Sequence, residues 1–260
     1  MSPEPEHVHG HGAADSAGQP WAGRSFTPNP AAGDDGSADA ALITALTGFR
    51  AGTARPEDVV EAFRSARLLI PLLAHAGEIG TAPDGHLVDK TQELSIVTVA
   101  APDGRRVLPA FTSVATMSAW DPQARPVPAA GPRVALAAAS EQTELIVIDP
   151  TAPTEFVLRR PAVYALATGE PWAAPHSLPG IRHAFERALE AEPDALAVEL
   201  LAGDPSQRLQ APELTVRLSV RAGLDSDALQ ALVARLSERW AASTDIAGGV
   251  DSLAVQVVRG

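Results

Sequence analysis

Hydrophobic residues recur at helical spacing in two neighbouring segments near the start of the expected fold. In residues 39–52, four large apolar residues fall on one helical face, and Gly52 ends the pattern. In residues 55–66, Pro56 occupies a first-turn position, two acidic residues follow it, and the apolar residues again share one face. The pattern predicts two amphipathic helices, whose inward-facing residues are Leu42, Ile43, Leu46, Phe49, Val59, Val60 and Phe63.

From residue 67 to residue 169, short apolar runs alternate with short helical patterns. Residues 67–74 form an apolar run that suits a buried strand. Residues 93–113 predict a β-hairpin, because Asp103-Gly104 separates two strand-like runs. The other predicted elements here are helices at 114–120, 131–141 and 161–169 and strands at 143–150 and 154–159.

After a proline-rich segment, the last part of the chain predicts the order helix, strand, strand, helix, strand. One of these strands, at 213–221, alternates cleanly between apolar and polar residues, so one face is buried and one is exposed. If the helices cover only the apolar side, the polar side can receive a partner; an ordinary solvated sheet face is the alternative. The polar residues are Thr215, Arg217, Ser219 and Arg221.

These elements predict an α+β (mixed α/β) fold of two domains, each a small mixed sheet packed with helices. Residues 1–37 lack periodicity and are rich in Gly, Pro and Ala, so we expect a disordered tail. The predicted domains cover residues 38–169 and 178–260, and a proline-rich linker at 170–177 joins them.

Composition narrows the classes of partner and site. The formal net charge is −12 at pH 7, which argues against binding to nucleic acid or an anionic membrane. Cysteine is absent, which excludes disulfides, thiol nucleophiles and Cys-ligated metals. No run approaches the roughly 18 apolar residues of a membrane span, and the N-terminus lacks the pattern of a signal peptide. We therefore expect a cytoplasmic protein.

The stretch LPAFTSVATMSAWDP, residues 108–122, joins a predicted strand to a predicted helix. Thr112 and Ser113 stand at the junction, where a side-chain oxygen can cap the helix by accepting a hydrogen bond from a first-turn amide. The same hydroxyls are candidates for contact with a ligand or partner through the helix start. A nucleophilic role lacks support, because the surrounding residues do not form a G-x-S-x-G motif and no histidine motif accompanies them.

Lys90 is the only lysine in a chain that otherwise uses arginine as its cation. A compact ammonium differs from a guanidinium in the contacts that it makes, so Lys90 is a candidate for ligand or partner contact together with its neighbour Asp89. Pairing with Asp89 or Glu93, or chance retention of one lysine, are the alternatives.

Histidines and carboxylates offer three weak metal-binding patterns. His7, His9 and His11 alternate in the tail, and His183 lies three residues before Glu186 on a predicted helix. A third set lies between predicted strands and consists of His75, Glu78, His86 and Asp89. None has enforced geometry, and the chain has no P-loop, G-x-G-x-x-G or H-E-x-x-H motif. We therefore predict no catalytic residue, no metal site and no cofactor.

The order of features between about residues 55 and 170 resembles the SseB family, named for enhanced serine sensitivity. Three stretches carry the resemblance, at residues 67–74, 86–127 and 144–150, the last of which is ELIVIDP. The resemblance implies an SseB N-terminal domain followed by the family's C-terminal domain. It implies no particular reaction, ligand or catalytic residue, and the histidine-containing tail departs from the family pattern.

Together these observations predict a bacterial accessory or regulatory protein that works by binding a protein partner and not by catalysis. The alternative is a metabolite-binding protein or enzyme, with a pocket between the Asp89–Lys90 segment and the helix that begins at Ser113. A concave pocket lined by polar residues would favour the alternative, and a flat surface with an apolar patch would favour the interaction protein.

Overall fold

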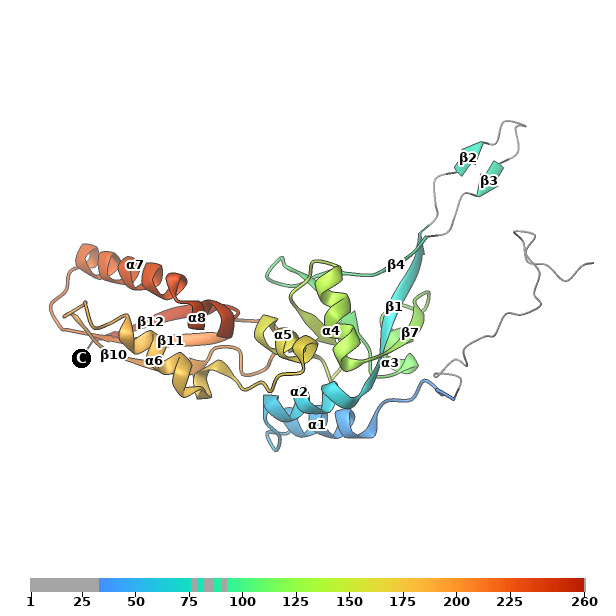
Figure 1. Ribbon diagram of the computed structural model, residues 1–260, viewed down its shortest axis with the longest axis horizontal. Coiled ribbons are helices and arrows are strands. Elements are labelled where there is room, and N and C mark those ends of the chain that lie inside the picture. The colour runs from blue at the N-terminus through green and yellow to red at the C-terminus, as the bar shows by residue number, and fades with distance from the viewer. Residues whose placement is uncertain (1–32, 76–78, 82–86, 90–92, 260) are drawn as a thin grey trace, which may run out of the picture. The chain divides into compact units, whose positions relative to one another are not determined.

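The computed structural model describes residues 33–75, 79–81, 87–89 and 93–259. For those of them from residue 74 to residue 95 inclusive, the backbone alone is described. Residues 36–260 form one unit of helices and small mixed sheets (Figure 1), which confirms the predicted α+β class. The expected tail lies almost wholly outside the described residues. The domain boundaries at 170 and 178 stay predictions.

The first two helices follow the periodicity of their sequences. α1 (Ala40–Arg50) begins at Asp39, whose carboxylate accepts hydrogen bonds from the amides of Ala41 and Leu42 at 2.9 and 3.0 Å. α2 (Pro56–Ser65) begins with its proline and carries two acids in its first turn. The helices lie side by side (Figure 1) and bury Leu42, Leu46, Val59, Val60 and Phe63.

The strand β1 (Arg67–His75) is the centre of a three-stranded sheet. It pairs antiparallel with β4 (Glu93–Ile96) on one side and with β7 (Arg125–Ala130) on the other. The sequence did not predict β7, because Pro126 and Pro128 interrupt it. Proline cannot donate to a strand ladder, but an edge strand tolerates it, and β7 is an edge strand of this sheet.

A second sheet has the strand order β5-β6-β8-β9. The predicted hairpin is confirmed: β5 and β6 are antiparallel, and Gly104 between them has φ +84°, a conformation that suits glycine. β8 pairs parallel to β6 and antiparallel to β9. The bounds are β5 (Val99–Ala100), β6 (Arg106–Ala110), β8 (Ile146–Ile148) and β9 (Phe156–Leu158).

Three further helices belong to this part of the chain, and two short strands pair with each other. α3 (Val114–Trp120), α4 (Gly131–Ser140) and α5 (Arg160–Thr168) form where the sequence predicts them. β2 (Ile79–Thr81) and β3 (Leu87–Asp89) are antiparallel. One aliphatic core unites α1, α2, α4 and α5 with the strands, and it includes Leu46, Phe63, Leu108, Val134, Ile146 and Leu166.

The last part of the chain forms a three-stranded sheet in the order β10-β11-β12. β10 and β11 are antiparallel, whereas β12 is parallel to β11 and follows a crossover through two helices. The elements are η1 (Pro175–Ser177), α6 (Pro179–Arg187), β10 (Ala195–Ala202), β11 (Leu214–Val220), α7 (Ser226–Ala242), α8 (Thr244–Gly249) and β12 (Leu253–Arg259). The predicted order is confirmed, with the short α8 added.

All three helices of this sheet cover the same face. Along β11, buried and half-buried residues alternate strictly, as the sequence predicts. The buried residues of β11 pack with Phe185 of α6, Trp240 of α7 and Ile246 of α8 in one cluster. The rings of Phe185 and Trp240 lie 5.2 Å apart. Within the described part of the chain, the opposite face of this sheet carries no helix layer.

Candidate functional site

Thr112 lies in a fully buried polar link between two segments of the SseB-like region. Its side chain is 0% exposed. Its amide donates to Asp149 Oδ1 and its hydroxyl to Asp149 Oδ2, both at 2.8 Å, and the hydroxyl of Thr154 donates to Oδ2 at 2.9 Å. Thr112 therefore fastens the end of β6 to the turn after β8, and its hydroxyl proton is directed at Asp149.

Ser113 caps α3, as predicted. Its hydroxyl accepts a hydrogen bond from the amide of Thr116 at 3.1 Å, and the hydroxyl of Thr116 accepts one from the amide of Ser113 at 3.2 Å. This reciprocal capping pattern satisfies two backbone donors at the helix start. Thr112 and Ser113 are neighbours with different tasks, one fastening strands and one starting a helix.

The other predicted site residues fall largely outside the described side chains. Lys90, Glu78, His86 and the tail histidines His7, His9 and His11 lie outside the described residues, and for His75 and Asp89 the backbone alone is described. The grouping of Asp89 and Lys90 with Ser113 stays a prediction. Among the residues that are described, no group of three His, Asp or Glu side chains is placed to hold a metal ion.

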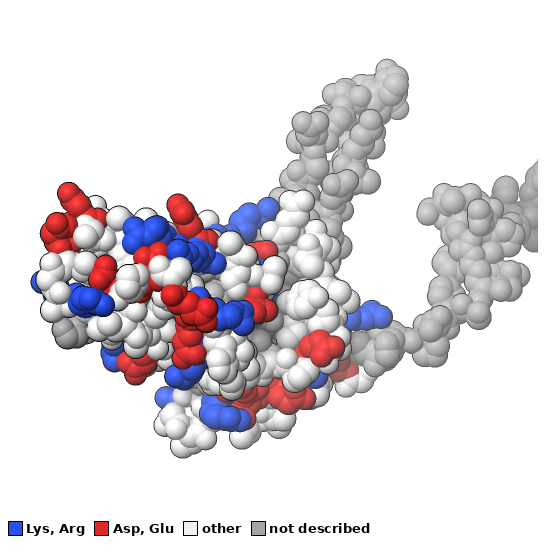
Figure 2. All heavy atoms as spheres, turned by 60° about the vertical axis from the view of Figure 1, so that its left-hand side comes forward, with Lys and Arg blue, Asp and Glu red and all other residues white. Residues whose placement is uncertain are grey.

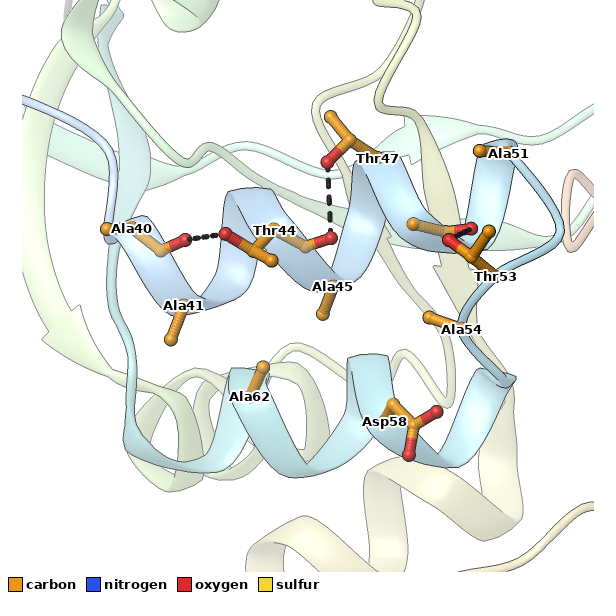
Figure 3. Close-up of a pocket in the computed structure, with 11 residues that line it drawn as sticks. Ala40, Ala41, Thr44, Ala45, Thr47, Ala51, Thr53, Ala54, Asp58 and Ala62 are labelled. Atoms are coloured by element: carbon orange, nitrogen blue, oxygen red, sulfur yellow. Dashed lines mark hydrogen bonds between the residues drawn. The ribbon is translucent and has the colours of Figure 1, made fainter.

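A broad groove between α1 and α2 is lined mainly by alanine and threonine (Figure 3). Its hydroxyls already donate to backbone carbonyls: Thr44 to Ala40 and Thr47 to Ile43, both at 2.7 Å, and Thr53 to Gly48 at 3.1 Å. Its acidic residue, Asp58, binds the amide of Arg55 at 2.7 Å. The groove thus presents little free hydrogen-bonding capacity for a small ligand.

The helix-free face of the β10-β11-β12 sheet carries a cross-strand row of polar side chains. Glu199, Arg217 and Gln256 are register partners on the three strands. Arg217 Nη1 lies 2.7 Å from Glu199 Oε2, and the two side chains are 39% and 54% exposed. An exposed pair of this kind contributes little to stability, roughly 0–1 kcal/mol. It presents both signs of charge on a flat surface instead. We call this surface the open face.

Apolar residues are exposed at one end of the open face. Ala197, Ser219 and Val258 form the next cross-strand row, and Val258 is 38% exposed. The register shifts between Ala195 and Ala197, and this β-bulge leaves Leu196 54% exposed. Bulges commonly redirect a side chain at a sheet edge. The open face therefore combines a charge pair with the exposed Val258, and Leu196 is exposed at the bulge of the edge strand β10.

Figure 2 shows basic and acidic side chains interspersed on the face that it presents. With the formal net charge of −12, this distribution differs from the single basic footprint of nucleic-acid binding proteins.

A buried ion-pair network lies where α5 begins. Arg159, 2% exposed, donates to Asp204 Oδ2 at 2.7 Å and to Asp251 Oδ2 at 3.2 Å. Arg105 reaches the same Asp251 with Nη1–Oδ1 at 2.8 Å. Burial by itself raises the pKa of Asp251, but hydrogen bonds and charge from Arg105 and Arg159 together hold that pKa below its ordinary value.

Glu213 lies beside this network, and its pKa is shifted in the opposite direction to that of Asp251. It is 6% exposed, and its Oε2 accepts a hydrogen bond from the amide of Asp251 at 2.6 Å. Burial raises the pKa of Glu213 to about 7, and the nearby charge of Asp251 adds to the rise, against the opposing effects of the Asp251 amide, Arg159 and Arg160. A buried carboxyl with a strongly shifted pKa is typical of functional sites.

Sequence reasoning did not single out Asp149, Arg159, Asp204 or Glu213. Asp149 offered the clearest signal, because it directly follows the buried strand in ELIVIDP. Glu213 stands just before β11, where its burial depends on segments far away in the sequence.

The comparisons with known proteins identify the first half of this fold. Residues 41–165 match the family model described as the SseB protein N-terminal domain. The chain belongs to the SseB family. The matched SseB domain begins in α1, ends in α5 and contains the Thr112–Asp149 link. No curated protein and no solved structure matched the chain.

No described helix combines the length and apolar character needed to cross a bilayer. The open face and Glu213 both lie beyond residue 165, outside the segment that matches the SseB N-terminal domain.

Proposed function

We propose that this member of the SseB family is a non-catalytic accessory or regulatory protein that binds a protein partner on its open face. The observation that carries the proposal is the one-sided helix cover of the β10-β11-β12 sheet. It leaves the Glu199–Arg217 pair and Val258 exposed on that face, and Leu196 is exposed at the bulge of the edge strand β10. Flat surfaces with this mixture are typical of protein interfaces.

The chemistry of the open face indicates the kind of partner. The surface of the partner should carry a basic group opposite Glu199 and an acidic group opposite Arg217. Leu196 and Val258 call for an apolar patch beside these charges. A cytoplasmic bacterial protein with such a surface is the partner that we propose.

The alternative role, a metabolite-binding protein or enzyme with a pocket near Asp89, Lys90 and Ser113, receives less support. The hydroxyl of Ser113 is engaged in capping α3, and that of Thr112 is engaged with Asp149.

Site-specific photocrosslinking tests the proposal. A photoreactive amino acid replaces the exposed Gln256 on the open face, or Arg182 on α6 as the matched control, and both proteins are irradiated in native cells. We expect one discrete protein adduct from position 256 and none of the same mass from position 182. The adduct should be lost when Arg217→Glu is added, but kept when Arg182→Glu is added instead, because only the first change reverses a charge on the open face.

Three results would contradict the proposal: no adduct from position 256, the same adduct from both positions, or an adduct that is indifferent to Arg217→Glu. An adduct with the mass of two copies of the chain would show that the open face is a dimer interface.

A further inference from the structure

A small pocket at Glu213 differs from the other hollows of the described structure in its chemistry. Its volume is about 180 Å³. Its apolar walls come from Phe49, Trp172 and three prolines, Pro56, Pro175 and Pro205. Glu213, His176 and Gln207 add polar groups to the lining. Apolar walls with a few polar groups are typical of small-molecule sites.

Glu213 is only half satisfied within the protein. Its Oε2 accepts from the Asp251 amide at 2.6 Å, whereas its Oε1 receives no hydrogen bond from any described residue. A carboxylate oxygen can accept more than one hydrogen bond. Oε1 therefore has capacity for a donor from outside the chain.

Trp172 supplies the complementary group. Its indole N–H is buried and finds no acceptor among the described residues. Among the groups that line the pocket, Glu213 can thus accept one more hydrogen bond, and the Trp172 indole N–H lacks an acceptor. His176 and Gln207 also line the pocket, and their side chains make no hydrogen bond with the described residues. Both side chains can donate and accept hydrogen bonds.

The loop that brings Gln207 to the pocket is held under strain. Gln207 and Leu209 have φ values of +51° and +56°, in the left-handed region that non-glycine residues rarely adopt. Asp204 holds the loop, because its carboxylate accepts from the Leu209 amide at 2.8 Å and from Arg159 at 2.7 Å. Strain maintained by a buried ion pair is common where a binding site is formed in advance.

From these features we infer that the pocket binds a small, neutral amide carried on a flat apolar ring. An amide N–H meets the free oxygen of Glu213, and the amide carbonyl accepts from the Trp172 indole. The ring lies against the aromatic and proline walls. This inference concerns a site separate from the open face and does not depend on the proposed function.

The size of the pocket limits the ligand. A cavity of about 150 Å³ in another protein accommodates a benzene ring. The 180 Å³ at Glu213 therefore suits one ring and one amide group. Benzamide has this composition and serves as the probe, and toluene is the matched control that keeps the ring and lacks the amide.

Indole N–H signals in a ¹H–¹⁵N correlation spectrum report binding directly. The chain has four tryptophans, and Trp172→Phe and Trp240→Phe identify two of the signals. Trp240 is an internal control, because its indole N–H is also buried without a partner among the described residues but lies outside this pocket. We expect millimolar benzamide to move the Trp172 signal downfield and to leave the Trp240 signal in place.

Variants separate binding from folding. Glu213→Gln keeps the shape of the side chain and removes its charge, so benzamide should bind about tenfold more weakly. Glu199→Gln makes the same change at an exposed position of β10 and should leave benzamide binding unchanged. In each variant, indole N–H signals at the same positions as in the natural protein show that the variant is folded.

Three outcomes would overturn the inference. The Trp172 signal stays in place at millimolar benzamide, toluene binds as tightly as benzamide, or Glu213→Gln binds benzamide as tightly as the natural protein. A response of Trp240 in place of Trp172 would assign benzamide to a different pocket and would equally overturn it.

Discussion

Asp149 and Glu213 are both buried carboxyl groups, and their surroundings differ in one respect. The oxygens of Asp149 accept three hydrogen bonds, from the amide and hydroxyl of Thr112 and from the hydroxyl of Thr154. Glu213 accepts one, from the amide of Asp251, and its second oxygen receives no bond from any described residue.

The difference separates a structural carboxylate from a candidate binding group. A fully bonded buried carboxylate has no capacity left for a ligand, and its removal leaves several donors without partners. A half-bonded carboxyl retains capacity for one more donor, and burial raises the pKa of Glu213 to about 7. The comparison predicts that removing the Asp149 side chain lowers the free energy of unfolding. Replacing Glu213 by a neutral residue should instead raise the free energy of unfolding at neutral pH.

The largest effect is expected at Asp149. Asp149→Ala leaves three donors without their acceptor, two of them buried, and places alanine at φ +44°, so we expect the free energy of unfolding to fall by about 3–5 kcal/mol. Asp149→Asn keeps one acceptor and tolerates that φ, so its loss should be about half as large. Urea denaturation measures both, and a loss below about 1 kcal/mol for Asp149→Ala would remove the structural role.

An intermediate and pH-dependent effect is expected at Glu213. Because its pKa is raised from 4.5 to about 7 on folding, the natural protein loses unfolding free energy as pH rises between these values. Glu213→Gln lacks this loss. Urea denaturation of both proteins across this pH range measures the effect. The free energy of unfolding of the variant, minus that of the natural protein, should rise by roughly 2–3 kcal/mol between pH 4.5 and pH 8.

The groups around Glu213 are common to both proteins in this comparison. Asp251, Arg159 and Arg160 act on its charge, and His176 lies in the same pocket wall. The difference between the two proteins therefore reports the Glu213 carboxyl together with its interactions with these groups. A difference that stays constant with pH would show that the Glu213 carboxyl titrates at its ordinary pKa.

The smallest effect is expected at the open face. The Glu199–Arg217 pair is exposed, so Glu199→Gln or Arg217→Gln should change the free energy of unfolding by less than about 1 kcal/mol. Thermal unfolding of the two variants checks this. A loss as large as that of Asp149→Ala would mean that the pair holds the sheet together, and it would remove the reason to assign the pair to recognition.

Much of the fold was predictable because its signals are local. The capping of α3 by Ser113, the hairpin at Asp103-Gly104 and the alternation of β11 depend on residues close together in the sequence. β7 escaped prediction because its two prolines are tolerated only through its edge position beside β1, which the sequence does not display.

The site was less predictable, because its members meet through the tertiary fold. Thr112 stood out in the sequence, but its partner Asp149 lies 37 residues away. Glu213 and Trp172 are unremarkable acidic and aromatic residues until the pocket places them in one wall with Phe49. Lys90 and Asp89, which composition singled out, remain predictions.

The most direct test of this account is the pKa of Glu213, measured from the carboxyl ¹³C chemical shift across a pH series, with the signal assigned by Glu213→Gln. Burial of the carboxyl, with the charge of Asp251 nearby, predicts a midpoint near pH 7 in the free protein. A midpoint near the ordinary value of 4.5 would show that Glu213 is solvated or fully bonded, and it would contradict the distinction between Glu213 and Asp149.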